Sequence, residues 1–396
     1  MEIGIFEIIE FVIVLLFIAA LVGIAVKKLR LPYTVGLVLI GLALALLGPT
    51  FLGLADNISQ ESLQSLLIPN LILGLLVPPL IFEAAFNIRF DELRRNLRTI
   101  LIFAVPGVII SMLIVGGLVS FGTELSLPVA LVFGALIAAT DPVAVVSLFK
   151  TLGVPKRIQV LLEGESLLND GTAIVIFSLM IVVAETAQFN FIDAIAEFFV
   201  VAFGGVFVGF IIGSITSIII RSVDDSLIEI TLTIVAAYGS FLIAEEFHFG
   251  GVLAVVAAGL VVGNVGPRGM SPTTRVTLHS FWDYLAFFVN SIIFLIIGLI
   301  IDLNEMLMHW GEILLAIGAV LVARMVVIYG FSRFGQDITR RTRHVLFWGG
   351  LRGAISLALV LSLDAAIFTS NEILLMHAMA FGIVLFTIVF QGSTMG

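Results

Sequence analysis

The sequence predicts an all-α polytopic membrane protein with about thirteen transmembrane helices, and three observations support this prediction. First, 60% of its 396 residues are hydrophobic and only 12% are charged, whereas about 25% of the residues in soluble domains are charged. Second, apolar runs of around twenty residues recur along the whole chain, and each is long enough to cross a bilayer. Third, the basic residues are confined almost entirely to every second loop between these runs.

The predicted spans follow one another through short loops, so residues 1–396 form a single transmembrane domain without a separate soluble one. The first run, Ile5 to Val26, is too long for a cleavable signal peptide and lacks its basic n-region, so we expect it to remain as a span. In chain order the spans cover residues 5–26, 33–53, 66–86, 97–120, 127–149, 157–184, 192–220, 226–247, 250–264, 281–301, 309–331, 344–362 and 373–391.

The positions of Lys and Arg test this count and give a topology. Of the 19 basic residues, 17 lie in alternate loops that begin with the loop after the first span, or in the first two residues of the span that follows such a loop, and the intervening loops contain none. Basic loops are retained in the cytoplasm, so the N-terminus is expected outside and the C-terminus inside. The 17 residues are Lys27, Lys28, Arg30, Arg89, Arg94, Arg95, Arg98, Lys150, Lys156, Arg157, Arg221, Arg268, Arg275, Arg333, Arg340, Arg341 and Arg343.

The two remaining arginines, Arg324 and Arg352, fall inside spans together with several acids. An unpaired charge in hydrocarbon costs several kcal/mol, so such groups pair with each other or face a water-filled path. Five carboxyl groups against two fixed cations leave spare carboxyls, which can hold either protons or metal cations. These acids are Glu83, Asp141, Glu163, Glu165 and Asp170.

Polar residues of the sixth span gather on one face of its helix. At roughly 100° per residue, the side chains of 163, 165, 166, 169 and 170 fall within an arc of about 160°, while Leu167 and Leu168 cover the other side. This face carries three carboxyls, an amide and a hydroxyl. It is therefore the strongest candidate for an ion or proton path.

Two spans contain signals for a broken helix. In the fifth, Thr140-Asp141-Pro142 places a proline near the middle, which removes a backbone N–H and pushes Asp141 away from helical geometry. In the twelfth, Gly349-Gly350-Leu351-Arg352-Gly353-Ala354 surrounds one arginine with three glycines. A simple proline kink and a close-packing glycine cluster are the alternatives. The two breaks are seven spans apart, so their helices run in opposite directions.

This parity is that of two inverted repeats, over residues 5–184 and 226–391, joined by a connector helix at 192–220. Paired interrupted helices at corresponding positions of two repeats indicate the substrate site of a transporter.

Four motifs together resemble the monovalent cation/proton antiporters of the NhaP and sodium/proton exchanger type. They are Leu-Val-Pro-Pro-Leu-Ile-Phe-Glu (76–83), Thr-Asp-Pro (140–142), Gly-Glu-Ser-Leu-Leu-Asn-Asp (164–170) and Gly-Gly-Leu-Arg-Gly-Ala (349–354). The resemblance covers essentially all thirteen spans. It implies inverted repeats with two crossing broken helices, a six-helix core domain and a dimerisation domain. It also implies exchange of Na⁺ (or Li⁺) for H⁺ by an elevator-like movement of the core, with no cofactor besides the transported ions.

Carried over by position, the resemblance implies that Asp170 binds both the cation and the proton. Ser166, Asp141 and the carbonyl of Thr140 would help to coordinate Na⁺, directly or through water. Asn169 stands where electrogenic relatives have a second acid, so electroneutral one-for-one exchange is expected. For Asp170 the alternative is a structural acid paired with an arginine, and for Ser166 it is a hydrogen bond back into its own helix.

The resemblance also implies a structural ion network. Glu165 would pair with Arg324, Arg352 would neutralise the helix ends at the second crossing, and Glu83 would join this network. The sequence ends at Gly396, just past its last span, whereas relatives usually continue into a cytoplasmic tail, so regulation by such a tail is expected to be either absent or lost from this sequence. The protein is expected to lie in the lipid bilayer of a prokaryotic plasma membrane and to form a homodimer. Its expected role is pH homeostasis, and no nucleic-acid partner is expected.

Other function classes fit less well but stay open. A K⁺/H⁺ antiporter would use the same oxygen ligands, and a cation channel or a non-transporting membrane sensor could use the same fold. An enzyme is not expected, because the chain has no nucleophile–base arrangement, no phosphate-binding loop and no His-Glu-x-x-His motif. It has no cysteine either, which excludes disulfides and thiolate metal sites.

Overall fold

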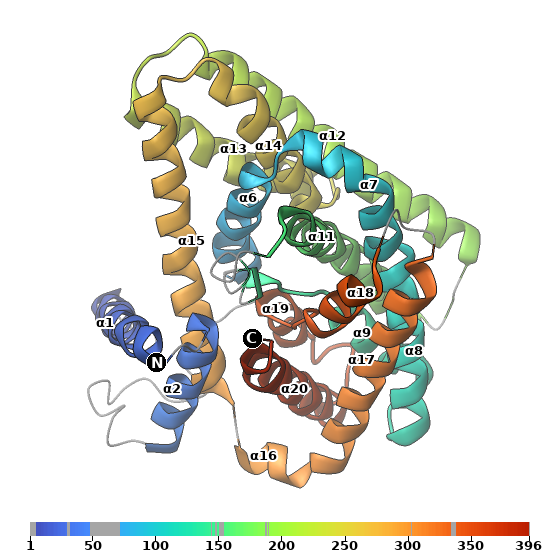
Figure 1. The fold of residues 1–396 in the computed structure, drawn as a ribbon. Coiled ribbons are helices and arrows are strands. Elements are labelled where there is room, and N and C mark those ends of the chain that lie inside the picture. Colours follow the sequence, from blue (N-terminus) through green and yellow to red (C-terminus); the bar gives the residue numbers. More distant parts are fainter. Residues whose placement is uncertain are drawn as a thin grey trace.

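The computed structural model describes residues 5–29, 32–47, 72–143, 145–146, 149, 154–186, 188, 190–301, 303–333 and 338–395, and its regular elements there are helices (Figure 1). In chain order they are α1 (Ile5–Leu29), α2 (Tyr33–Leu47), η2 (Ile72–Leu76), α6 (Val77–Asn87), α7 (Phe90–Ala104), α8 (Pro106–Gly122), α9 (Leu127–Leu136), α11 (Lys156–Thr186), α12 (Phe191–Ile220), α13 (Ser226–Glu246), α14 (Gly251–Val265), η3 (Gly266–Arg268), α15 (Pro272–Ile300), α16 (Leu303–Met308), α17 (Trp310–Phe331), α18 (Arg340–Trp348), α19 (Ala354–Leu361), α20 (Ser370–Leu385) and η4 (Phe386–Gln391).

Each of the thirteen predicted spans coincides with helix in the described residues, so the predicted polytopic helical fold is confirmed. Eight helices are long and apolar enough to cross a membrane, and four shorter apolar ones accompany them. The chain is therefore a multi-pass membrane protein. Residues 48–53 and 66–71 of the second and third predicted spans lie outside the described residues, as do 144, 147 and 148 of the fifth and the basic positions 30 and 150.

Two helices begin earlier than the apolar runs predicted. Helix α7 starts at Phe90 rather than at residue 97, and its first turns carry arginines that the sequence placed in a loop. It is amphipathic, with Leu93, Ile100 and Phe103 buried on one face, so its average hydropathy is low although its helical period is intact. Helix α15 likewise starts at Pro272, where the hydroxyl of Ser271 accepts a hydrogen bond from the N–H of Thr274.

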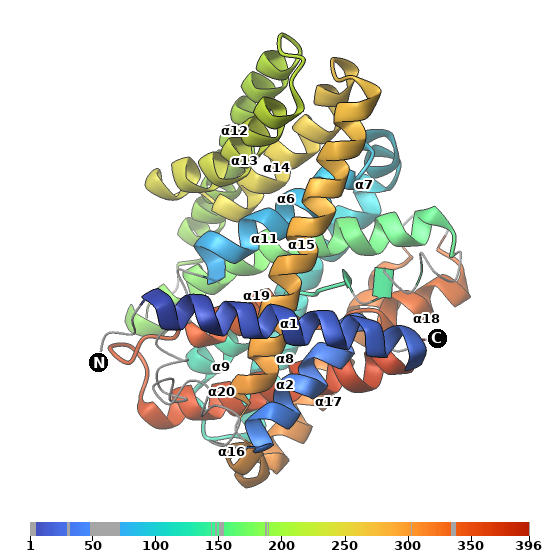
Figure 2. The same ribbon diagram turned by 90° about the vertical axis from the view of Figure 1, so that its left-hand side faces the viewer.

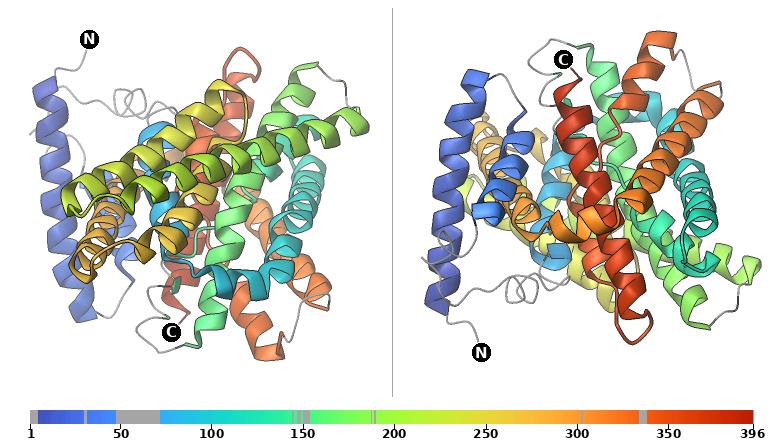
Figure 3. Two further views of the ribbon diagram at one scale, coloured as in Figure 1. Left: turned by 90° about the horizontal axis from the view of Figure 1, so that it is seen from above. Right: turned by 90° about the horizontal axis from the view of Figure 1, so that it is seen from below.

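The helices run in two main directions. Helices α1, α11 and α20 are seen nearly end-on in Figure 1 and lengthwise in Figure 2, whereas α15 crosses them in both views. Helix α12 lies over α13 and α14 when the molecule is seen from above (Figure 3). Glycines permit this close crossing, because a Cβ atom at Gly205, Gly209 or Gly213 of α12 would meet the backbone of Gly250, Ala254 or Ala258.

The start of α1 and the C-terminal end of the chain lie on opposite sides of the molecule (Figures 2 and 3). An odd number of spans requires this. Helix α18, which begins with Arg340 and Arg341, lies on the same side as the C-terminal end, and so does the end of α1 with Lys27 and Lys28 (Figure 2). The basic residues at both ends of the chain therefore gather on one face.

Candidate functional site

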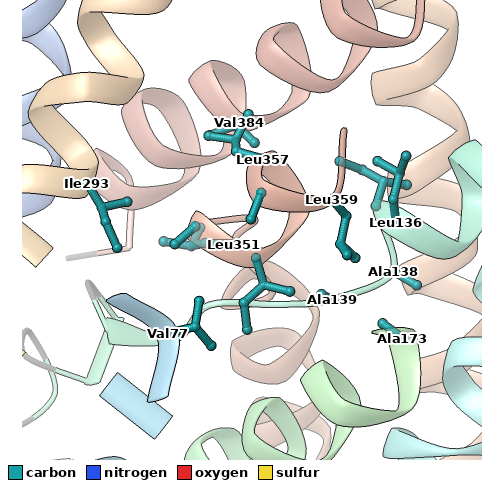
Figure 4. Close-up of a cluster of buried hydrophobic side chains, with 14 of the residues drawn as sticks. Val77, Leu136, Ala138, Ala139, Ala173, Ile293, Leu351, Leu357, Leu359 and Val384 are labelled. Atoms are coloured by element: carbon teal, nitrogen blue, oxygen red, sulfur yellow. The ribbon is translucent and has the colours of Figure 1, made fainter. Parts of the chain in front are cut away.

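Two helices are interrupted, and their interruptions meet. Helical structure stops after Leu136 and resumes at Val143, and it stops again between Trp348 and Ala354. The backbone N–H of Asp141 donates a 2.8 Å hydrogen bond to the carbonyl oxygen of Leu351, which links one break to the other. Figure 4 shows the extended segment with Ala138 and Ala139 passing beside Leu351, and both predicted breaks are confirmed.

Arg352 lies at the end of α9, where the last carbonyls of a helix carry partial negative charge. Its Nη1 donates hydrogen bonds to the carbonyl oxygens of Ala138 and Ala139, at 2.5 and 2.9 Å. The guanidinium is 2% exposed. Arg352 thus satisfies carbonyls that the break leaves without intrahelical partners.

The glycines of the second break make room for charged groups of its neighbours. A Cβ atom at Gly350 would lie 2.5 Å from Nε of Arg324, and one at Gly353 would overlap the Asp141 carboxylate. Asp141 in turn caps the second half of its own helix, because its Oδ1 accepts a 2.9 Å hydrogen bond from the N–H of Val143.

The polar face of α11 holds the first break. The Ser166 hydroxyl donates to the carbonyl oxygen of Thr140, rather than back into its own helix. The Asn169 Nδ2 donates to the Thr140 hydroxyl at 2.6 Å, and its Oδ1 accepts from the Thr140 N–H at 3.3 Å. The predicted site residues on α11 and at the first break are therefore brought together.

The two central acids of α11 have different surroundings. Glu165 is 2% exposed and accepts from both terminal nitrogens of Arg324, one of which also donates to the Leu346 carbonyl at 2.9 Å. Asp170 is 6% exposed, and within the described part of the chain its carboxylate has neither a salt bridge nor a hydrogen bond. Asp170 is a buried carboxylate available to an exchangeable ligand.

Asp170 and Asp141 line a cavity of about 350 Å³ that extends between α6, α11, α15 and the two breaks. Its described lining contains no Lys, Arg or His but five acids, namely Glu83, Asp141, Glu163, Asp170 and Asp283. Asn87 and Asp283 are exposed, so the mouth lies beside them. A cavity lined by carboxylates concentrates cations.

Glu83 lines this cavity from α6, and its Oε1 accepts a 2.5 Å hydrogen bond from Asn87 one turn later. Several polar lining residues were not predicted from the sequence, among them Tyr33, Asp283 and Asn290. Asp283 lies within the predicted span 281–301 and could have been counted among the intramembrane acids. Asn290 follows it at seven residues, a helical-face spacing that indicates a shared environment.

Comparisons with known proteins agree with this geometry. The family described as "Sodium/hydrogen exchanger, transmembrane" matches residues 13–396. The chain is 41% identical over 373 residues to the Na⁺/H⁺ antiporter ApNhaP of Aphanothece halophytica, which is 92% of this chain and 68% of that protein. It is 36% identical over 389 residues to the Na⁺/H⁺ antiporter NhaH of Halobacillus dabanensis, covering 97% of this chain and 95% of that one.

The fold is similar to the structure of the sodium proton antiporter MjNhaP1 from Methanocaldococcus jannaschii at pH 8, with a TM-score of 0.80 at 23% sequence identity, over 97% of this chain and 96% of that chain. The match of the family over nearly the whole chain, the two crossing breaks and the unpaired buried carboxylate beside them lead to one conclusion. The chain belongs to the sodium/hydrogen exchanger family and is of the NhaP type.

Proposed function

We propose that this protein exchanges Na⁺ for H⁺ across the membrane, with Asp170 as the group for which the two ions compete. The observation that carries the proposal is the Asp170 carboxylate, which is buried, without a protein partner among the described residues, and open to an acidic cavity. Two relatives that match most of the chain are named Na⁺/H⁺ antiporters, which favours Na⁺ over K⁺ as the cation.

Competition at one carboxylate is sufficient to couple the two fluxes. The Asp170 carboxylate holds either a proton or a cation, and each of them neutralises it. An unneutralised carboxylate is costly to move through a low-dielectric barrier, so the occupied forms cross and the empty form does not. Each Na⁺ moved in one direction is then matched by one H⁺ moved in the other.

The remaining ligands come from groups that already surround Asp170. The Asp141 carboxylate, the Thr140 carbonyl and the Ser166 hydroxyl supply hard oxygens, which suit a small alkali cation. Asn169 positions Thr140 through two hydrogen bonds and adds no charge of its own. One titrating carboxyl per cation, with Asn169 neutral, makes the exchange electroneutral.

The two buried arginines have structural roles. Arg324 is paired with Glu165, and Arg352 donates to the carbonyls at the end of α9, so in the described residues neither arginine forms a salt bridge with Asp170. Glu83 and Glu163 line the approach to the site. In this proposal the breaks and α11 move as a core against a scaffold that includes α15, and the protein is a homodimer.

The positive-inside rule gives the orientation. The face with the basic residues is cytoplasmic, the N-terminus is outside, and the membrane is the plasma membrane of a prokaryote. The cavity mouth lies at Asn87, two residues before the basic segment that starts at Arg89, and with this proposed orientation the cavity opens to the cytoplasm.

Proton movement in everted vesicles tests the proposal. Addition of Na⁺ should raise the pH of the acidic vesicle lumen, and Asp170→Asn should abolish this response. A matched control is Asp193→Asn, which changes an exposed acid in the first turn of α12 away from the cavity.

Exchange that persists in Asp170→Asn contradicts the role of this carboxylate. An equal response to K⁺ would change the substrate to a K⁺/H⁺ exchange. Cation current without countermovement of protons would make the protein a channel.

A further inference from the structure

Helix α15 presents to the cavity one face that carries a polar side chain at each end and apolar side chains between them. This face is formed by Asp283, Ala286, Phe287 and Asn290, which are spaced by three, four and seven residues from the first. That spacing places all four side chains on one side of a helix. Asp283 is exposed near the mouth and Asn290 is buried, so the face runs from the entrance inward.

Asn290 is a buried amide without a partner. It is 8% exposed and lines the cavity, yet its side chain makes no hydrogen bond within the described residues. The other two buried asparagines of the described chain, Asn96 and Asn169, are engaged at both the amide nitrogen and the amide oxygen. Because the Asn290 amide borders the cavity and no described residue engages it, it is free to contact an ion in the cavity.

The wall that carries Asn290 is braced. The next residue, Ser291, donates to the carbonyl oxygen of Phe287 at 2.5 Å and shares a 2.8 Å hydrogen bond with the Tyr33 hydroxyl. The Tyr33 ring stacks on Phe287 with centroids 5.0 Å apart. The brace joins α15 to α2, so Asn290 is held at a fixed place beside the cavity.

We infer that the amide oxygen of Asn290 is a further contact for the transported cation, on the scaffold wall of the cavity that leads to Asp170. This inference rests on the proposed function. An amide oxygen is a hard ligand that replaces one water of a partly dehydrated alkali cation. The ion then gains a protein contact on the side away from the acids of α11 and the first break.

Because Asn290 carries an amide, its contact affects the binding of the cation but not the binding of the proton. An amide oxygen binds a cation but does not take up a proton in the physiological pH range, so Asn290 acts on cation affinity and not on proton affinity. Its loss raises the KM for Na⁺ at every pH by the same factor. The pH at which protons begin to compete stays where it was.

The experiment measures Na⁺/H⁺ exchange in proteoliposomes over a range of Na⁺ concentration and pH for wild type and for Asn290→Leu, which keeps the size and removes the polar atoms. The expected result is a KM for Na⁺ raised by about tenfold, typical of losing one contact to a charged group, with an unchanged pH profile. Asn290→Asp retains an oxygen ligand and should keep the KM at or below the wild-type value.

Asn96→Leu is the matched control, because it makes the same change at a buried asparagine of α7 that is hydrogen-bonded within the protein and does not line the cavity. It should lower the Tm in detergent and leave the KM unchanged, whereas Asn290→Leu should leave the Tm unchanged or raise it. A wild-type KM in Asn290→Leu, or a lowered Tm with a shifted pH profile, overturns the inference while the exchange function stands. A wild type without Na⁺-driven proton movement overturns both.

Discussion

Gly353 lies so close to Asp141 that a Cβ atom at position 353 would overlap the Asp141 carboxylate. The Asp141 carboxylate of one broken helix thus occupies the space that a side chain at position 353 of the other broken helix would fill. This contact explains why a glycine follows Arg352: the carboxylate of Asp141 can reach the cavity only because position 353 has no side chain.

Gly353→Ala should therefore impair exchange strongly, by about tenfold or more in rate, because the added methyl group displaces the Asp141 carboxylate from its place in the cavity wall. A 1.4 kcal/mol change in the relevant free energy is enough for that factor. Proton flux in proteoliposomes measures it. The control is Gly318→Ala in the interior of α17, where a Cβ atom would meet nothing within 4 Å. That change should leave exchange intact and stabilise the helix by about 0.5–1 kcal/mol; equal loss in both variants would contradict the packing explanation.

Arg324→Ala should destabilise the protein more than Glu165→Gln. The first change leaves the buried Glu165 carboxylate without its cation, at a cost of about 3–5 kcal/mol. The second leaves Arg324 its hydrogen bond to the Leu346 carbonyl, and glutamine still accepts a hydrogen bond. Thermal unfolding in detergent compares the two. Equally small losses of Tm would mean that the ion pair is not what holds α11, α17 and α18 together.

Asn169→Asp adds a second titratable carboxyl beside Asp170 and should make exchange depend on membrane voltage. The added charge also replaces the Nδ2 donor to Thr140, so some loss of rate is expected. Flux measured at imposed K⁺/valinomycin potentials gives the result. A variant that still transports and ignores the potential would show that Asn169 serves only to position Thr140.

Lower pH should raise the KM for Na⁺ and leave the maximal rate less affected. The sign follows from competition: below the pKa of the competing carboxyl, each pH unit increases the protonated fraction, and the KM rises by about tenfold per unit for one proton per site. Initial rates over a grid of Na⁺ and pH measure this dependence. A KM independent of pH, with only the maximal rate falling, would place the proton at a group other than the cation site.

Much of the fold could be predicted from local sequence. A helix in lipid must satisfy its own backbone, so an apolar run of sufficient length already specifies a span. Pro142 and the glycines around Arg352 break helices by local chemistry, and both breaks were predicted. The starts of α7 and α15 were not, because amphipathic turns such as Phe90–Arg98 are helical by period and not by hydropathy.

Less of the site could be predicted. The positions of the charged residues in the sequence predicted that Glu165, Asp170 and the two arginines lie within spans, but they did not predict which of them form pairs. The partners lie far apart in sequence, as with Arg324 of α17 and Glu165 of α11, so only the tertiary structure chooses between the possible pairs. Asn290 was missed because the cavity it lines is made by helices distant in sequence.

The sequence by itself determined that this is a polytopic helical membrane protein with more carboxyl groups than arginines inside its spans. It could do so because the effects of hydrophobicity, charge and proline on the backbone extend over only a few neighbouring residues. Only the tertiary structure decided which carboxylate is left unpaired. Arg324 is paired with Glu165 and Arg352 donates to the carbonyls of Ala138 and Ala139, whereas the Asp170 carboxylate lines the cavity without a salt bridge or hydrogen bond among the described residues. Which charge is neutralised depends on three-dimensional proximity in a low-dielectric interior, and no local pattern contains that information.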